Sequence, residues 1–179
     1  MIDHPVLGQI VLGYSPMIDR HRAIIALRLT IFPLRPDAPP VAADLVAALA
    51  AAWPEDAGRV SLDVVGEPLL ERLLQARLAP NQMLDVPAFV AADVAHTPAL
   101  AALHRQGTTL LIKGRPLSPL PKPVLDAFDY SIIDLADERR DGMPPPGGVS
   151  RNIPHVQAGV RTLAAANAPG FNTAGWYVL

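Results

Sequence analysis

Short apolar segments alternate with longer amphipathic segments along this chain. Strands are expected over 8–19 and 22–32, joined by a turn near Asp19 and His21, and again over 59–65, 81–87 and 110–113. Leucine and valine positions at helical spacing predict helices over 41–49 and 67–78. Thr97 followed by Pro98 predicts a helix start, with Thr97 as the N-cap and Gly107 beyond the end. The remaining pattern predicts a short helix over 124–128, strands over 130–135 and 153–157, an alanine-rich helix, and a last strand within 171–179.

Repeated strand–helix units behind an N-terminal hairpin predict a mainly parallel sheet with helices outside it. A closed barrel and an open doubly wound sheet both satisfy this pattern. No glycine-rich phosphate loop follows the first strand, so nothing favours a nucleotide-binding open sheet. The 20 prolines gather between the periodic segments, where they mark joints.

Composition narrows the class of protein. With 179 residues, 50% of them apolar, the chain is long enough for one domain, 1–179, with a sizeable core. A net charge of -2 without a basic run argues against nucleic acid as a partner. The absence of cysteine excludes disulfides and cysteine-ligated metals. No segment resembles a signal peptide or a membrane span, so we expect a cytoplasmic protein.

Charged residues fall late in five of the predicted strands. Strand ends of a parallel barrel meet at one mouth, where such folds build their sites. A single aspartate after a strand is most often a turn former or a helix cap. Three aspartates in different units allow two further interpretations, a metal site or an ion-pair network with the two cations. The residues are Arg28, Asp63, Asp85, Lys113 and Asp134.

Seven segments, in order, resemble EAL-domain proteins, the cyclic di-GMP phosphodiesterases. "YSPMIDRHRAIIALRLTIF" is similar to the family's opening, in which a strand and a turn precede the Glu-Ala-Leu signature. "RVSLDVV" resembles the strand that ends in a metal-binding Asn, and "QMLDVPA" the Leu-Glu-Ile-x-Glu segment. The later matches are "HRQGTTLLIKGR", "YSIIDL", "VQAGVRT" and the ending "GFNTAGWYVL". The resemblance implies a TIM-like (β/α) barrel whose first strand runs antiparallel to its neighbours.

The residues that depart from the family pattern carry the functional expectation. The signature Glu position holds Arg28, and the paired aspartates become Lys113 and Gly114. Two-metal hydrolysis needs clustered carboxylates, so each cation reverses the local charge and we expect no metal cofactor and no phosphodiesterase activity. Further departures are Phe32 for the substrate-contacting Arg, Asp63 for Asn, Asp85 for Glu, Ala88 for Glu, Ile132 for Lys, Ala158 and Arg161 for two Glu, and Ala174 for Gln, while Asp134 is retained.

These features predict a degenerate, catalytically inactive EAL-like module that regulates bacterial signalling through protein contacts, with a protein partner or a second copy. Helices are expected to be shortened or missing near 136–152 and at the C-terminus, which would leave apolar surface to cover. A downstream HDOD domain is a further candidate for that cover. The rival is a metal-independent sensor of cyclic di-GMP or another anion on Arg28, Lys113, Arg115 and Arg161. A different enzyme using Asp63, Asp85 and Asp134 ranks last, because no base–nucleophile pair accompanies them.

Overall fold

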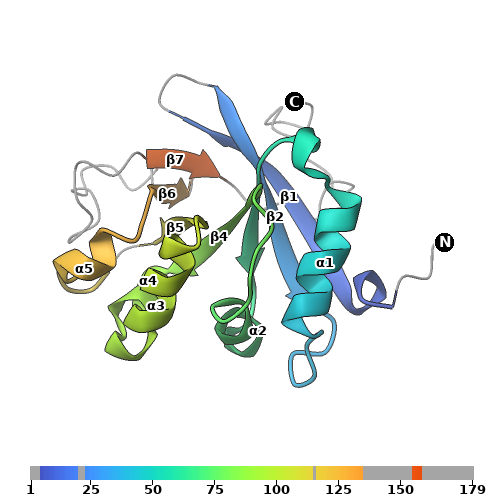
Figure 1. The fold of residues 1–179 in the computed structure, drawn as a ribbon, viewed down its shortest axis with the longest axis horizontal. Helices are drawn as coiled ribbons and strands as arrows, with labels where there is room; N and C mark the ends of the chain where they lie inside the picture. The colour runs from blue at the N-terminus through green and yellow to red at the C-terminus, as the bar shows by residue number, and fades with distance from the viewer. Residues whose placement is uncertain (1–4, 20–22, 115, 135–154, 159–179) are drawn as a thin grey trace, which may run out of the picture.

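Seven strands form one closed sheet in the computed structural model, which describes residues 5–19, 23–114, 116–134 and 155–158. The strands follow sequence order around the barrel, and Figure 1 shows them crossing the middle of the molecule. They are β1 (Ile10–Ile18), β2 (Ile24–Pro33), β3 (Val60–Val64), β4 (Gln82–Pro87), β5 (Thr109–Lys113), β6 (Tyr130–Asp134) and β7 (His155–Ala158).

The strand directions confirm the expected barrel with an antiparallel first strand. β1 pairs with β2 antiparallel, from Ile10 opposite Pro33 to Ile18 opposite Ile24. Each following pair from β2–β3 to β6–β7 is parallel. β7 meets β1 at one antiparallel position, Ile18 opposite Gln157. The carboxyl ends of β2 to β7 therefore share one end of the barrel, called the mouth end below, where β1 begins.

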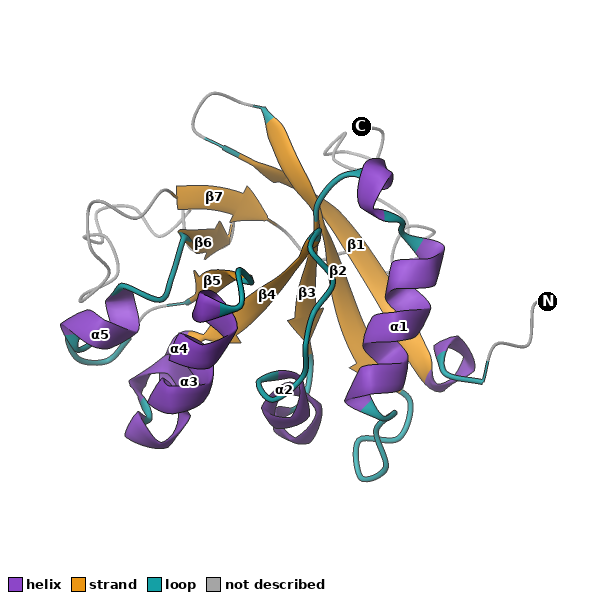
Figure 2. Ribbon diagram, viewed as in Figure 1, coloured by secondary structure: helices purple, strands orange, loops and turns teal. Residues whose placement is uncertain are grey.

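The helices lie outside the sheet, as Figure 2 shows. α4 runs from Thr97 to Arg105, close to the expected range, but its N-cap is His96 and not Thr97. Asp93 caps the preceding 3-10 turn instead, because its side chain accepts from the Ala95 amide. The helices are α1 (Ala42–Ala52), α2 (Glu67–Leu73), α3 (Ala88–Ala92), α4 (Thr97–Arg105) and α5 (Lys122–Leu125), with 3-10 turns at Leu7–Gln9, Glu55–Ala57 and Val94–His96.

Two helices differ from the expectation. α2 ends at Leu73, not near 78, because the next amides bond three residues back, Gln75 to Arg72 and Ala76 to Leu73. Leu78 is nevertheless buried, as its place in the leucine stripe predicted. α3 was not predicted, since five apolar residues are too few to show a helical period. The helix losses expected near 136–152 and at the C-terminus fall outside the described residues.

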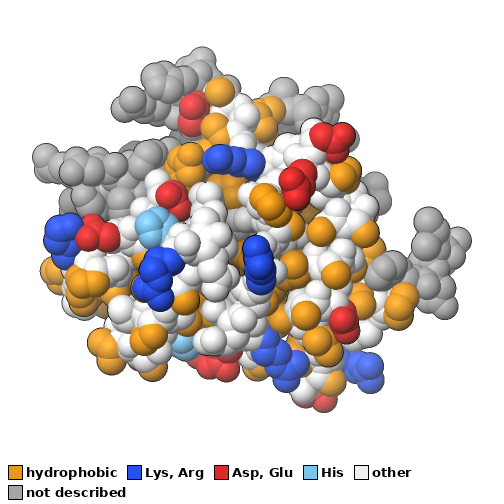
Figure 3. All heavy atoms as spheres, viewed as in Figure 1, with side chains coloured by type: hydrophobic (Ala, Val, Ile, Leu, Met, Phe, Trp, Pro, Cys, Tyr) orange, Lys and Arg blue, Asp and Glu red, His pale blue; other side chains and the backbone are white. Residues whose placement is uncertain are grey.

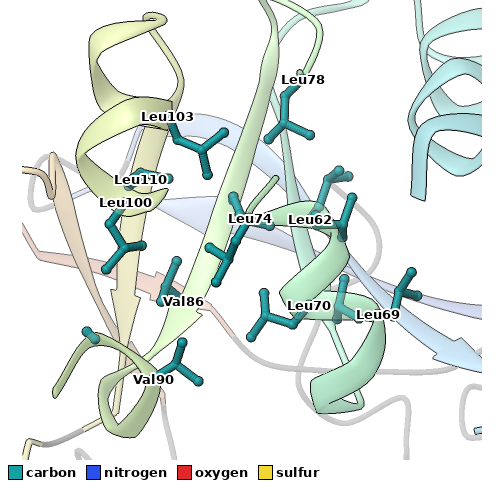
Figure 4. Packing of buried hydrophobic residues seen from close by; sticks show 14 of the residues in the cluster. Leu62, Leu69, Leu70, Leu74, Leu78, Val86, Val90, Leu100, Leu103 and Leu110 are labelled. Atoms are coloured by element: carbon teal, nitrogen blue, oxygen red, sulfur yellow. The ribbon is translucent and has the colours of Figure 1, made fainter. Parts of the chain in front are cut away.

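Successive side chains of each strand point to opposite faces of the sheet, so the core has two parts. Side chains on the outer face of the sheet pack against the helices, as Figure 4 shows for Leu62, Val86 and Leu110 with leucines of α2 and α4. The opposite set fills the barrel interior, where the apolar cluster consists of Met17, Ala26, Met83, Leu111 and Ile132. The next inward positions toward the mouth end, two residues further along β2 to β5, are polar. They hold the candidate site.

A buried asparagine ties the start of β4 to the α1–β3 connection. Asn81 Nδ2 donates to the carbonyls of Pro54 and Gly58 at 3.1 Å each and lies 3.4 Å from that of Trp53. The Pro54 carbonyl also accepts from the Ala57 amide, and the Gly58 carbonyl also accepts from Trp53 Nε1, so Asn81 adds a second donor to each. No helix among the described residues is long and apolar enough to cross a membrane.

Candidate functional site

The candidate site is a layer of polar side chains inside the barrel at its mouth end. Period-two alternation points Arg28 and Thr30 of β2 inward, and it does the same for Ser61 and Asp63 of β3. Asp85 of β4 and Lys113 of β5 occupy the equivalent inward positions, as their contacts with β2 and β3 establish. The four strands thus bring residues 85 positions apart in the sequence into one cluster, which we call the mouth network: Arg28, Thr30, Ser61, Asp63, Asp85 and Lys113.

Arg28 is the centre of the mouth network. Its Nε donates to Asp85 Oδ2 at 2.5 Å, and its Nη2 lies 2.9 Å from Asp63 Oδ2. Only 1% of Arg28 is exposed, and the two aspartates are buried to a similar degree. A buried guanidinium is tolerable when carboxylates contact it in this way, and it would be costly alone. One arginine therefore joins the carboxylates of two neighbouring strands.

Lys113 completes the network from the solvent side. Its Nζ donates to Asp63 Oδ1 at 2.9 Å, while Thr30 Oγ1 donates to Asp63 Oδ2 at 3.1 Å. The lysine side chain is 38% exposed, so it lies between the buried carboxylate and water. Gly114 follows with φ +81, a left-handed conformation that ends the strand directly after the lysine.

The side chain of Asp85 is fully buried in the network. Its Oδ1 accepts a hydrogen bond from Ser61 Oγ, and its Oδ2 accepts from Arg28. Burial raises the pKa of Asp85 above its ordinary value, and the nearby Asp63 carboxylate adds to the rise. The Arg28 charge and the two hydrogen bonds act in the opposite direction without cancelling the effect of burial. Hydrogen bonds and the Arg28 charge thus stabilise the Asp85 carboxylate, and its burial opposes the charged form.

The network leaves no carboxylate oxygen free to bind a cation. Each oxygen of Asp63 and Asp85 contacts a donor from Arg28, Lys113, Thr30 or Ser61. Two formal positive charges balance two negative ones. Within the described part of the chain, no group of three or more His, Asp or Glu side chains could hold a metal ion. The described residues of the mouth network do not fit a two-metal centre, which requires several carboxylates unpaired with fixed cations.

Four of the six residues predicted for the site meet in the mouth network: Arg28, Asp63, Asp85 and Lys113. Asp134 ends β6 beside Ala158 of β7, at the mouth end, and its side chain is outside the description. Arg161 lies outside the described residues, as does Arg115. The sequence interpretation missed Thr30 and Ser61 as partners. Both could have been predicted from the spacing, because each lies two positions from a charged residue on the same strand and therefore points to the same face of the sheet.

A cavity of about 390 Å³ lies elsewhere, lined by Gln75, Arg77 and Gln106. These residues precede β4 and β5, so the cavity is at the end of the barrel opposite the mouth network. One exposed arginine and two amides supply no built ligand site there.

Comparisons with known proteins find likeness in structure alone. No family model matches the chain, and no curated protein sequence matches it. The structure is similar to the PaMucR phosphodiesterase in complex with c-di-GMP, with a TM-score of 0.46 and 16% identity over 70% of this chain and 69% of that one. It is also similar to Klebsiella pneumoniae BlrP1 in its manganese and cy-diGMP complex, with a TM-score of 0.47 and 15% identity over 79% of this chain and 43% of that one. The EAL domain of Mycobacterium smegmatis DcpA gives a TM-score of 0.41 and 16% identity over 70% and 65%. This chain thus spans less than half the length of BlrP1.

Proposed function

We propose that this chain is a catalytically inactive EAL-like barrel that acts as a regulatory module through contacts with a protein. The observation that carries the proposal is the position of Arg28 between Asp63 and Asp85. The sequence resemblance aligns Arg28 with the signature Glu of the EAL family, and it aligns Lys113 with an aspartate. By this resemblance, a guanidinium and an ammonium would stand where that family has metal ligands, and in this chain they contact the carboxylates of Asp63 and Asp85.

Two measurements on the full chain test the loss of activity. Purified protein is incubated with cyclic di-GMP and Mg²⁺ or Mn²⁺, and the linear product is separated by chromatography. We expect no product above the protein-free blank and no heat when Mn²⁺ is titrated into the protein. Metal-dependent hydrolysis that disappears in Asp63→Asn would overturn the proposal.

A charge-restoring variant supplies the matched comparison. Arg28→Glu places a third carboxylate beside Asp63 and Asp85, so like charges repel unless a cation joins them. We expect Mn²⁺ to raise the melting temperature of Arg28→Glu and to leave that of the wild type unchanged, because ligand binding stabilises only a protein that binds it. An equal shift in both proteins would show that Arg28 does not block a metal position.

The alternative is a metal-independent sensor of cyclic di-GMP or another anion at the mouth. One observation favours it: Lys113 is partly exposed, and its ammonium could contact a phosphate. Arg28 argues against it, because both of its aspartate contacts would have to be exchanged for the ligand. Isothermal titration of cyclic di-GMP without metal separates the two functions. One-site binding that is lost in Lys113→Met would favour the sensor.

A further inference from the structure

Exposed apolar side chains are gathered at one end of the barrel. Large hydrophobic residues at the surface are ordinary when they are scattered singly. Among the described residues, eight of them are exposed, and seven of the eight lie at the mouth end. These seven, called the mouth rim below, are Val11, Leu34, Val41, Val65, Phe89, Val94 and Leu117.

Topology places the mouth rim. Leu34 and Val65 directly follow the last residues of β2 and β3, and Phe89 lies in α3 just after β4. Leu117 follows β5 and is fully exposed. Because β2 to β5 are parallel, these four residues surround the same end of the barrel. The remaining members lie at the start of β1 (Val11, opposite Phe32), before α1 (Val41) and between α3 and α4 (Val94).

Ile24, the eighth residue, begins β2 at the other end of the barrel. It has a similar exposed fraction, 51%, to Leu34 and Val41, at 58% each. It therefore provides a matched control for any effect of the mouth rim.

Exposed carboxylates outnumber exposed arginines in the segments that carry the mouth rim. The segments 34–44, 65–72 and 88–97 carry five exposed carboxylates against two exposed arginines; at the same end Lys113 is 38% exposed and pairs with Asp63, and Lys122 pairs with Asp126. Orange, red and blue side chains are interspersed along the lower edge of Figure 3, toward which the arrowheads of β2 and β3 point in Figure 2. The five carboxylates are Asp37, Asp44, Glu67, Glu71 and Asp93, and the arginines are Arg35 and Arg72.

We propose that the mouth rim binds an amphipathic segment of a protein partner whose apolar side chains are flanked by Lys and Arg. This deepens the proposed function, on which it rests, by naming the surface and the chemistry of the partner. Apolar anchors would supply the contact area, and the acidic excess would select a basic partner by complementarity. A second copy is disfavoured because two acidic rims would face each other. An anionic membrane is disfavoured for the same electrostatic reason.

A peptide titration on the full chain tests the surface. The probe is a fluorescein-labelled Leu/Lys amphipathic helix of about five turns, compared with a Leu/Glu peptide that has the same apolar face. We expect the Leu/Lys peptide to bind, the Leu/Glu peptide to bind at least about tenfold more weakly, and added salt to reduce the difference. Phe89→Ser with Leu117→Ser should raise the Kd of the Leu/Lys peptide at least about tenfold, as loss of central apolar contacts does at other interfaces. Ile24→Ser should change it less than about twofold.

Each other outcome overturns the assignment. Equal affinity for the two peptides would show that the surface does not select a basic partner. Equal effects of Ile24→Ser and of Phe89→Ser with Leu117→Ser would show that the mouth rim is not the binding surface. A wild-type dimer in light scattering that Phe89→Ser with Leu117→Ser dissociates would make a second copy the occupant. Rim-dependent binding to phosphatidylserine vesicles would replace the protein with a membrane. Thermal melts confirm that each variant is folded, and hydrolysis of cyclic di-GMP would separately overturn the proposed function.

Discussion

Arg28→Met is the substitution that best tests the mouth network. Methionine keeps much of the length and apolar stem of arginine but removes the guanidinium that contacts Asp63 and Asp85. Asp63 would keep Lys113 and Thr30, whereas Asp85 would keep Ser61 alone. Breaking a buried ion pair from one side costs about 3–5 kcal/mol, because it leaves an uncompensated charge.

The expected loss is large beside the total stability of a domain, about 5–15 kcal/mol. For a chain of this size each kcal/mol corresponds to about 2–4 °C in melting temperature, so we expect a fall of about 6–20 °C. Urea unfolding followed by circular dichroism gives the free energy. Arg59→Met is the control, since Arg59 is exposed directly before β3 and the loss of its side chain should change stability by about 0.5 kcal/mol or less.

A double-mutant cycle separates the charge effect from lost packing. Asp85→Asn removes the carboxylate most dependent on Arg28, so Arg28→Met should cost less in that background, by about 0.5–3 kcal/mol. A cost for Arg28→Met below about 1 kcal/mol would refute the reasoning. So would a cost that is unchanged by Asp85→Asn, because the arginine would then act through packing alone.

Three further predictions follow from the same structure. The raised pKa of Asp85 means that the native state binds a proton at a higher pH than the unfolded chain, so the stability due to this group grows as the pH falls through the raised value toward the ordinary one of about 3.9. The free energy of unfolding of the wild type, relative to Asp85→Asn, should therefore increase between neutral and acidic pH, and a decrease would contradict this direction. Lys113→Met should cost only about 1 kcal/mol or less, because that ion pair reaches solvent; a cost equal to that of Arg28→Met would be inconsistent with its exposure. Asn81→Ala should cost about 0.5–1.5 kcal/mol, the net value of a hydrogen bond, because the Pro54 and Gly58 carbonyls each keep a second donor, while Gln75→Ala, at an exposed site, should have little effect.

Secondary structure at the level of element type was predictable because burial imposes a period. The leucine stripe near α2 follows from one buried face, and the apolar runs of β3, β4 and β5 follow from a sheet that is buried on both faces; these positions are buried as expected. Short elements were not predictable. The five residues of α3 are too few to show a period, and the end of α2 depends on bonds that tighten after Leu73.

The sequence by itself determined which residue types are available: two cations and several aspartates at strand ends, and no cysteine. Its alternation of strands and helices allowed a barrel or an open sheet, and its resemblance to EAL-domain proteins implied a barrel with an antiparallel first strand. It left open whether the aspartates cap helices, bind a metal or pair with cations. Only the tertiary structure decided this for Asp63 and Asp85, because barrel closure brings β2, β3, β4 and β5 within side-chain reach and sets which charges meet in a medium where unpaired charge is costly. The mouth rim likewise arises from topology, since Leu34, Val65, Phe89 and Leu117 are separated in the sequence and share one end only because their strands run parallel.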